Sequence, residues 1–382
     1  MILFNDKRTQ LDDLLDKMAE KVQLGKTRYN RMIEHYEAVK DWIESDEQFF
    51  KPYKYDIYPH GSVRIQTTVK PIGKDEFDLD IAIHLKTSWA NHSPQRIYNE
   101  LKRRLGEHEK YKSMMELKNR CVRLNYAGDF HMDIMPGIQE SEYNEDKIRV
   151  PDKELNSWVS SNPRGYAKWF HHKANMVKQS LLEKALRAEG LPADDFENKK
   201  PLQRAVQLIK RYRDICFQKD DSYKTSSIVL TTVAGQFYNG EDSIYETIDN
   251  VITKIRSKMN LQAGRIKVLN PVNEEEDFTD KWDDEPQYYI EFQKFCEFLY
   301  ETWQKLKEEN GVLEEGELLK GLFGTEIFVE AQKAQTDELE NLRERGNLNI
   351  NRSTGVLTSI SGISSSPVKK NTFFGFGSKS DD

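Results

Sequence analysis

The sequence has little cysteine and histidine, and it contains no long apolar run. Its three cysteines, Cys121, Cys216 and Cys296, are far apart among 382 residues. An odd number of distant cysteines excludes a disulfide framework and a zinc cluster built on paired cysteines. No stretch approaches the roughly 18 uncharged apolar residues that a membrane span needs. Charged residues also follow the N-terminus too closely for a signal peptide. We therefore expect a cytoplasmic protein without a membrane span.

The balance of charge is acidic. The chain carries 57 Lys and Arg against 64 Asp and Glu, which gives a formal net charge of -7. Domains that bind duplex DNA or generic RNA usually have a strongly basic surface. The net charge therefore argues against nucleic acid as the main partner, although it leaves room for a local basic groove.

Apolar residues recur at helical spacing near the N-terminus. They include Leu11, Leu15, Met18, Met32 and Tyr36. This spacing predicts a long amphipathic helix over 8–45, interrupted near Gly25. We expect this helix to pack against the rest of the fold as a brace.

The pattern changes to alternation between about 55 and 150. Every second residue of 76–85 is apolar, which places Asp78 and Asp80 together on the opposite face of a strand. Residues 121–126 and 130–135 alternate in the same way on either side of a short Gly-Asp turn. They predict an antiparallel hairpin with Asp133 on its polar face.

Helical periodicity dominates after about 165. The runs with helical spacing are 201–217, 226–239, 243–258, 286–309 and 313–334. Strands followed by helices predict an α+β fold with a first lobe over 1–165 and a helical lobe over 166–340. Residues 351–382 are rich in Ser, Gly and Lys and predict a disordered tail. Its apolar cluster at 373–377 is a candidate docking motif for a regulatory partner protein.

Three carboxylates carry the chemical signal. Side chains at i and i+2 of a strand lie on one face roughly 7 Å apart, so Asp78 and Asp80 hold two negative charges close together. If the strand over 130–135 pairs beside 76–85, Asp133 joins them. Carboxylate oxygens are ligands that Mg²⁺ prefers, and three carboxylates can hold two metal ions about 3.5–4 Å apart. We therefore predict a site for two Mg²⁺ ions, which Mn²⁺ could also occupy.

A Gly-Ser pair precedes these carboxylates. Gly61 allows a close backbone approach, and the hydroxyl of Ser62 can donate to a phosphate oxygen. Arg64, Lys70 and Lys74 follow and could neutralise further negative charge. The pair therefore predicts a phosphate-binding turn.

Gly61-Ser62, Asp78-Leu79-Asp80 and Asp133 follow one another in the order typical of the polymerase-β-like nucleotidyltransferase superfamily. Segments 60–85 and 130–137 are more specific and resemble the bacterial cGAS/DncV-like nucleotidyltransferases (CD-NTases). Members of that family synthesise cyclic oligonucleotides in antiphage signalling.

The resemblance continues into the helical part of the chain. Segments 205–214, 225–232 and 270–282 look like second-lobe elements that the family shares with oligoadenylate synthases. In all, the resemblance covers about 10–330. It implies a polymerase-β-like nucleotidyltransferase lobe with a mixed sheet, followed by an oligoadenylate-synthase-like helical lobe, with the long N-terminal helix bracing both. The active site would lie in the cleft between the two lobes.

The resemblance also implies the roles of individual residues. Asp78, Asp80 and Asp133 would be the catalytic and metal-binding residues. The residues that would bind the triphosphate of the nucleotide are Gly61, Ser62, Lys210 and Ser227. Tyr212 and Trp282 could stack on a base, although aromatic residues of a helical lobe more often belong to its core.

Two departures from the family narrow these expectations. No Cys/His cluster matches the zinc-bearing insertion of the animal DNA sensor, so nothing in the sequence supports activation by duplex DNA. The chain ends in Asp382, without the terminal glycine through which some members are conjugated to other proteins. Conjugation is therefore not expected.

The resemblance thus implies an enzyme that takes nucleoside triphosphates, ATP among them, and forms a cyclic di- or trinucleotide second messenger with release of pyrophosphate. Two alternatives stay open. A terminal nucleotidyltransferase acting on an RNA 3′ end would need a basic track, which the acidic composition disfavours. A nucleotide-binding regulatory pseudoenzyme would not need all three carboxylates.

Overall fold

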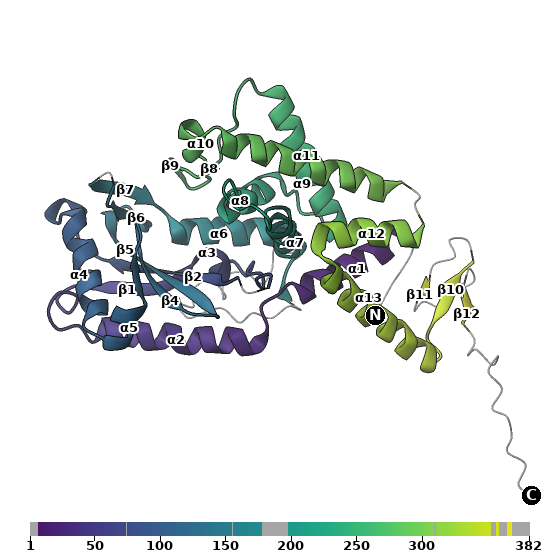
Figure 1. Ribbon diagram of the computed structural model, residues 1–382, viewed down its shortest axis with the longest axis horizontal. Helices are drawn as coiled ribbons and strands as arrows, with labels where there is room; N and C mark the ends of the chain where they lie inside the picture. The colour runs from purple at the N-terminus through teal and green to yellow at the C-terminus, as the bar shows by residue number, and fades with distance from the viewer. Residues whose placement is uncertain are drawn as a thin grey trace, which may run out of the picture.

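A mixed sheet and a bundle of helices lie side by side in the computed structural model, with the sheet on the left of Figure 1. The structure describes residues 7–73, 75–154, 156–177, 198–308, 311–352, 357–358 and 365–368. The helices are α1 Lys7–Lys21, α2 Lys26–Glu44, α3 Gly61–Arg64, α4 Pro94–Gly106, α5 Glu109–Met114, α6 Pro163–Ala174, α7 Pro201–Cys216, α8 Ser227–Phe237, α9 Ile244–Leu261, α10 Lys281–Asp284, α11 Gln287–Lys307, α12 Val312–Phe323 and α13 Thr325–Glu344. The strands are β1 Tyr55–His60, β2 Phe77–Leu85, β3 Met115–Leu117, β4 Val122–Tyr126, β5 Phe130–Ser141, β6 Asn144–Asp152, β7 Ser157–Ser161, β8 Leu269–Asn270, β9 Asn273–Asp277, β10 Asn349–Asn351, β11 Leu357–Thr358 and β12 Ser365–Pro367.

The central sheet is mixed, as expected. Its order is β1-β2-β5-β4-β3, with β6 paired to β5 and β7 paired to β6. Strands β2 and β5 run parallel, and their register places Asp80 beside Asp133. Strands β4 and β5 form the antiparallel hairpin that the alternation predicts. The condition for bringing the three carboxylates together is therefore met.

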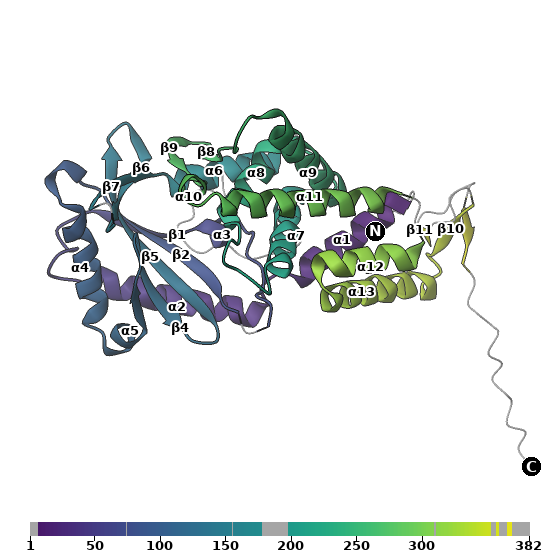
Figure 2. The same cartoon turned by 45° about the horizontal axis from the view of Figure 1, so that its top comes forward.

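The two faces of the sheet differ in chemistry because β2 alternates. Leu79, Ile81 and Ile83 are buried in a hydrophobic cluster with residues of α2 and α4, such as Met32 and Leu101. Figures 1 and 2 show α2 lying along the sheet on this side. The opposite face, which carries the aspartates, is turned toward α3 and the helical lobe.

The predicted N-terminal helix is two helices, with the break at the expected place around Gly25. Leu15 and Met18 of α1 are buried in the core of the helical lobe. Met32 and Tyr36 of α2 are buried in the core of the sheet. Each helix thus braces a different lobe. The N-terminal segment therefore braces both lobes, as expected.

The helical lobe has a continuous core around α7, α9 and α11, with Phe292 and Trp303 fully buried. The run predicted as one helix over 313–334 is instead α12 and α13. Gly324 separates them with a φ of +95°, a conformation that favours glycine. The β8–β9 hairpin was not expected from the sequence, because apolar and polar residues do not alternate regularly in its two short strands.

The segment after α13 differs in part from the predicted disordered tail. Strand β10 pairs with both β11 and β12 in a three-stranded antiparallel sheet. The described residues of 351–382 therefore include regular strands. The candidate docking cluster at 373–377 lies outside the described residues. Throughout the part of the chain that the structure describes, no helix combines the length and the apolar character needed to cross a bilayer.

We expect Trp303→Ala to lower the free energy of unfolding by about 3–5 kcal/mol, because it leaves a large cavity in the helical core. Ile290→Ala on the same helix is the control, since Ile290 is 42% exposed and should cost far less. Chemical denaturation of both variants measures the difference. Equal destabilisation would contradict the described core.

Candidate active site

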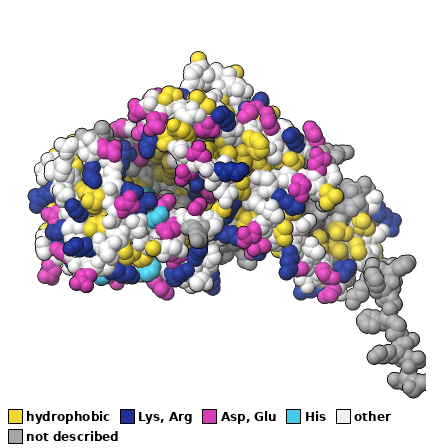
Figure 3. All heavy atoms as spheres, viewed as in Figure 1, with side chains coloured by type: hydrophobic (Ala, Val, Ile, Leu, Met, Phe, Trp, Pro, Cys, Tyr) yellow, Lys and Arg dark blue, Asp and Glu magenta, His cyan; other side chains and the backbone are white. Residues whose placement is uncertain are grey.

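A cavity of about 520 Å³ lies between the polar face of the sheet and the helical lobe. Figure 3 shows the surface hollowed between these two parts of the molecule. The sequence-predicted site residues all line this cavity: Gly61, Ser62, Asp78, Asp80, Asp133, Lys210 and Ser227. Residues more than 150 positions apart in the chain therefore meet at one place.

Asp78, Asp80 and Asp133 form the sheet wall of the cavity. The side chain of Asp78 is 54% exposed, whereas Asp133 is only 18% exposed. Burial, together with the charges of Asp78 and Asp133, raises the pKa of Asp80 to about 7. Each of these causes disfavours a negative charge on Asp80. The wall thus concentrates more negative charge than the protein alone can stabilise.

Arg123 neutralises part of this charge, and the sequence reasoning did not single it out. From β4, its Nε and Nη2 donate to the two carboxylate oxygens of Asp133 at 2.7 and 2.8 Å. Its Nη2 also donates to Oδ1 of Asp78 at 3.2 Å. Nδ1 of His131 lies 3.3 Å from the same Asp78 oxygen. Alternation in 121–126 places Arg123 on the polar face, which is the signal that could have found it.

The Gly-Ser pair begins α3, directly against the carboxylates. Gly61 has a φ of +57°, and a Cβ added there would lie 2.0 Å from Oδ2 of Asp80. Only glycine allows this backbone to approach the carboxylate so closely. The hydroxyl of Ser62 lies 3.3 Å from that of Thr68. The pair therefore lies at the start of a short helix against the carboxylates, and its phosphate-binding role stays a prediction.

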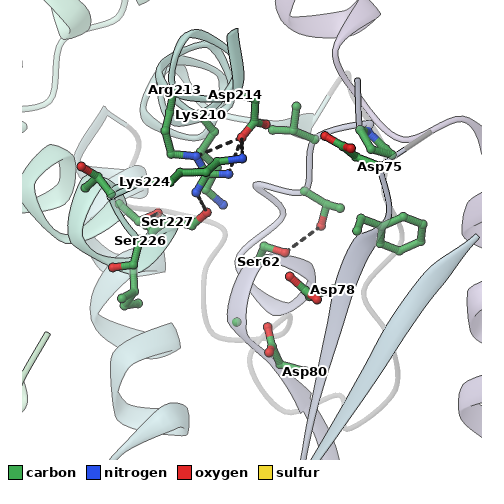
Figure 4. Close-up of a pocket in the computed structure, with 18 of the residues that line it drawn as sticks. Ser62, Asp75, Asp78, Asp80, Lys210, Arg213, Asp214, Lys224, Ser226 and Ser227 are labelled. Carbon is green, nitrogen blue, oxygen red and sulfur yellow. Dashed lines mark hydrogen bonds and ion pairs between the residues drawn. The ribbon is translucent and has the colours of Figure 1, made fainter. Parts of the chain in front are cut away.

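Lys210 and Ser227 lie on the opposite wall, contributed by α7 and α8 (Figure 4). The ammonium of Lys210 donates to the carbonyl and hydroxyl oxygens of Thr67 at 3.1 and 3.0 Å. Burial, followed by the charge of Arg213, lowers the pKa of Lys210 to about 7. Lys210 is therefore a buried side chain that faces the cavity, and it is not a solvated surface lysine.

Further cations surround Ser227. The guanidinium of Arg213 donates to the Ser227 hydroxyl. Arg213 and Lys224 also pair with Asp214 at 2.6 and 3.0 Å. Although burial acts to raise it, these two cations lower the pKa of Asp214. Neither Arg213 nor Lys224 was singled out by the sequence, because charged residues of a helix and a loop resemble a solvated surface.

Two aromatic residues of the helical lobe belong to its core. Tyr212 is 2% exposed and stacks on Phe295 with ring centroids 4.7 Å apart, so it belongs to the core. Trp282 is 5% exposed and packs against Phe292. Neither lines the cavity, so the core position that the sequence favoured for both is confirmed and the base-stacking alternative is not supported.

Two of the cations expected after the Gly-Ser pair do not form part of the cavity wall. Arg64 and Lys70 are absent from its lining, and Lys74 lies outside the described residues.

Known proteins resemble this chain in sequence and in fold. A family model described as a Second Messenger Oligonucleotide or Dinucleotide Synthetase domain matches residues 10–174. A protein of Roseivirga ehrenbergii named c-di-GMP synthase is 43% identical to this chain over 377 residues. That match covers 98% of this chain and 100% of the relative. The chain belongs to the bacterial cGAS/DncV-like nucleotidyltransferases.

More distant members of the CD-NTase family confirm the fold. The cyclic dinucleotide synthase CdnG of Bradyrhizobium diazoefficiens is 25% identical over 353 residues, covering 86% of this chain and 84% of the relative. The solved structure of that CD-NTase in complex with GTP has a TM-score of 0.67 at 23% identity and covers 86% of this chain and 99% of its own. Escherichia coli DncV in its 3′-deoxy GTP bound form has a TM-score of 0.55 at 16% identity, covering 72% of this chain and 70% of that one. This CD-NTase therefore has the expected polymerase-β-like fold and is a nucleotidyltransferase that synthesises cyclic oligonucleotides.

The donor set of this CD-NTase fits divalent cations. In the described residues, no three His, Cys, Asp or Glu side chains already converge as a metal site, and both oxygens of Asp133 accept from Arg123. The buried Asp80 nevertheless lies beside two further carboxylates, and its burial followed by their repulsion raises its pKa. A set made of carboxylate oxygens alone is one that Mg²⁺ and Mn²⁺ prefer. Bound cations would remove the repulsion that the protein leaves in place.

We expect Gly61→Ala in this CD-NTase to reduce product formation at least about 100-fold, because the new methyl group displaces Asp80. Gly128→Ala is the matched control. Gly128 has a comparable φ of +78° but nothing within 4 Å of an added Cβ. Turnover and thermal melting of both variants separate the clash from the backbone cost. Equal turnover in the two variants would contradict the close approach.

Proposed function

We propose that this enzyme joins two GTP molecules into cyclic di-GMP and releases two pyrophosphates. The supporting observation is the opposition of two walls across one cavity. Three carboxylates lie on the sheet, and Lys210, Arg213 and Lys224 lie on the helical side. The base is inferred from the Roseivirga relative named c-di-GMP synthase, which matches over nearly the whole chain. GTP thus replaces the ATP that the sequence expectation included.

The carboxylates would hold the catalytic cations. Asp80 and Asp133 are opposite each other on adjacent parallel strands, and Asp78 lies two residues before Asp80 on the same face, so the three carboxylates line the same side of the cavity. Two divalent cations bound there would lower the pKa of the attacking ribose hydroxyl and stabilise negative charge at the reacting α-phosphate. Each Asp133 oxygen accepts one hydrogen bond from Arg123 and has a further lone pair, so Asp133 could ligate a cation while keeping this contact.

The helical wall would bind the triphosphate. Lys210, Arg213 and Lys224 supply the positive charge, while the hydroxyls of Ser62 and Ser227 can donate to phosphate oxygens. Pairing with Asp214 holds Arg213 and Lys224 at the edge of the cavity. The triphosphate would extend from the carboxylates toward α7 and α8. Its α-phosphate would then lie at the sheet wall.

Several wider expectations belong to the same proposal. The cyclic dinucleotide would act as a second messenger in antiphage signalling, as the family resemblance implies. The cytoplasmic location, the domain boundaries at 165 and 340, and a regulatory partner bound through the C-terminal tail stay predictions. The terminal nucleotidyltransferase and the regulatory pseudoenzyme are the alternatives that the assay below excludes or supports.

We expect the purified protein, given all four nucleoside triphosphates and Mg²⁺, to form a phosphatase-resistant product with the mass of cyclic di-GMP. Asp133→Asn should reduce its formation at least about 100-fold, because it removes a charged ligand. Asp146→Asn is the control, since Asp146 pairs with the exposed Lys168. Mass spectrometry after phosphatase treatment measures the product.

The other outcomes of this assay are equally specific. Linear products alone would support a terminal transferase. Nucleotide binding without pyrophosphate release would support a pseudoenzyme. Wild-type turnover by Asp133→Asn would contradict the assigned carboxylate site.

The pKa of Lys210 gives a pH dependence. Without substrate, the amine of Lys210 is largely unprotonated above about pH 7. A bound triphosphate favours the protonated, charged form of this side chain. Binding should therefore take up a proton, and affinity should fall as pH rises from about 7.5 to 9. Calorimetry of a non-reactive GTP analogue in buffers of different ionisation enthalpy measures this uptake. Uptake of the same size in Lys210→Met would contradict the assignment.

A further inference from the structure

Helix α7 carries a stripe of polar side chains that are almost completely buried. Gln203, Gln207, Lys210 and Arg211 are 2%, 0%, 4% and 3% exposed. Their spacing of i, i+4, i+7 and i+8 places them on one face of the helix. Apolar residues normally occupy such positions on a buried helix face. Hydrophobic packing therefore does not explain why these four positions are polar.

All four side chains donate to the same short segment, the loop 65–70. Gln203 donates to the carbonyl oxygen of Ile65 at 3.0 Å. Gln207 donates to that of Thr68 at 2.8 Å. The two remaining donors, Lys210 and Arg211, reach the carbonyl oxygens of Thr67 at 3.1 Å and Lys70 at 2.7 Å. One helix face thus satisfies four carbonyl groups within six consecutive residues.

This loop belongs to the cavity. It follows the Gly-Ser turn directly and leads toward β2, and Ile65, Thr68 and Val69 line the cavity wall. Its amides are held separately, because Thr67 N–H donates to the carbonyl of Ser62 at 2.9 Å and Lys70 N–H to that of Val22 at 2.8 Å. Any displacement of the loop would therefore change the wall beside the phosphate-binding turn.

The stripe is not arranged to maximise stability. Oε1 of Gln207 and Nε of Arg211 are buried without a hydrogen-bond partner among the described residues. Buried polar atoms without partners disfavour the folded state, and apolar side chains would avoid that cost only by leaving the four loop carbonyl groups without donors. The observation that accounts for these side chains is the row of carbonyl groups that they bind.

Lys210 differs from the other three members of the stripe. Under the proposed function its ammonium binds the triphosphate, so at least part of its bonding to Thr67 is given up when substrate arrives. Gln203, Gln207 and Arg211 do not line the cavity and can keep their carbonyl partners throughout. The loop therefore has three holding points that substrate binding leaves intact.

We propose that Gln203, Gln207 and Arg211 are positioning residues that hold the loop 65–70 in its substrate-binding conformation while Lys210 turns from Thr67 to the triphosphate. This inference rests on the proposed function. It adds that α7 serves the site in two ways, through one cation that contacts substrate and through three donors that contact only the loop. The nucleotide-binding wall is then formed before substrate binds.

The test uses Gln207→Met, which removes the donor at nearly constant volume, in the full-length protein. Gln335→Met is the matched control. Gln335 is a 7% exposed glutamine of α13 that donates to the Gln10 carbonyl and to Asp13, far from the cavity. Both variants lose buried hydrogen bonds, but only Gln207→Met releases the loop. Thermal melting of both variants measures the general loss of stability.

Two measurements report on the loop itself. Hydrogen exchange of the amides in 62–72, without nucleotide, should speed up about five- to tenfold in Gln207→Met and stay unchanged in Gln335→Met. The KM for GTP should rise by a similar factor in Gln207→Met only. Arg211→Lys keeps a hydrogen-bond donor, so its KM for GTP should rise less than that of Arg211→Met.

The outcomes separate this inference from the proposed function. If the wild-type protein forms no cyclic product, the proposed function fails, and hydrogen exchange still decides whether the stripe holds the loop. If the wild type does form the product, but Gln207→Met keeps the wild-type exchange rate and KM, the positioning role is wrong. Equal changes in Gln207→Met and Gln335→Met would assign the stripe to general stability and would also overturn it.

Discussion

The repulsion among three carboxylates on one face of a sheet is the constraint on which this site depends. Parallel pairing of β2 and β5 places Asp80 beside Asp133, and burial adds to the cost of charging Asp80. The protein relieves this repulsion only in part, through the bidentate hydrogen bonds of Arg123 to Asp133. At Gly61 the backbone lies so close to the carboxylate of Asp80 that no side chain fits between them. The remaining negative charge is what makes the site suited to divalent cations.

The rest of the fold places a wall of opposite charge across from the carboxylates. Helices α7 and α8 supply Lys210, Arg213 and Ser227. The loop 65–70 lies between α3 and β2 in sequence and is hydrogen-bonded to α7 in space. Helices α1 and α2 pack against different cores, so the N-terminal segment ties the helical lobe to the sheet. Because α7 belongs to the helical core and also binds the loop that follows α3, the relative position of the two walls is set by buried contacts.

Much of the sheet wall could be predicted from the sequence, because its information is local. Alternation in 76–85 decides which face Asp78 and Asp80 share, and the hairpin at 121–135 follows from the same period.

The helical wall could not be predicted in this way. Gln207 and Arg211 look like surface residues of a helix until the loop that they bind is placed against them. The pairing of Arg123 with Asp133 depends on strand neighbours, and Tyr212 looked available for base stacking because its burial depends on Phe295 from a distant helix. Lys210 and Ser227 were found only through the family resemblance.

The central claim is that the crowded carboxylates are a two-cation site opposite a triphosphate-binding wall. The most direct measurement is a crystal structure with Mn²⁺ and a non-reactive GTP analogue, using anomalous scattering to locate the metal. We predict two anomalous peaks about 3.5–4 Å apart, ligated by Asp78, Asp80 and Asp133, with the triphosphate extending to Lys210 and Ser227. Manganese absent from these carboxylates, or a triphosphate bound away from α7 and α8, would contradict the account.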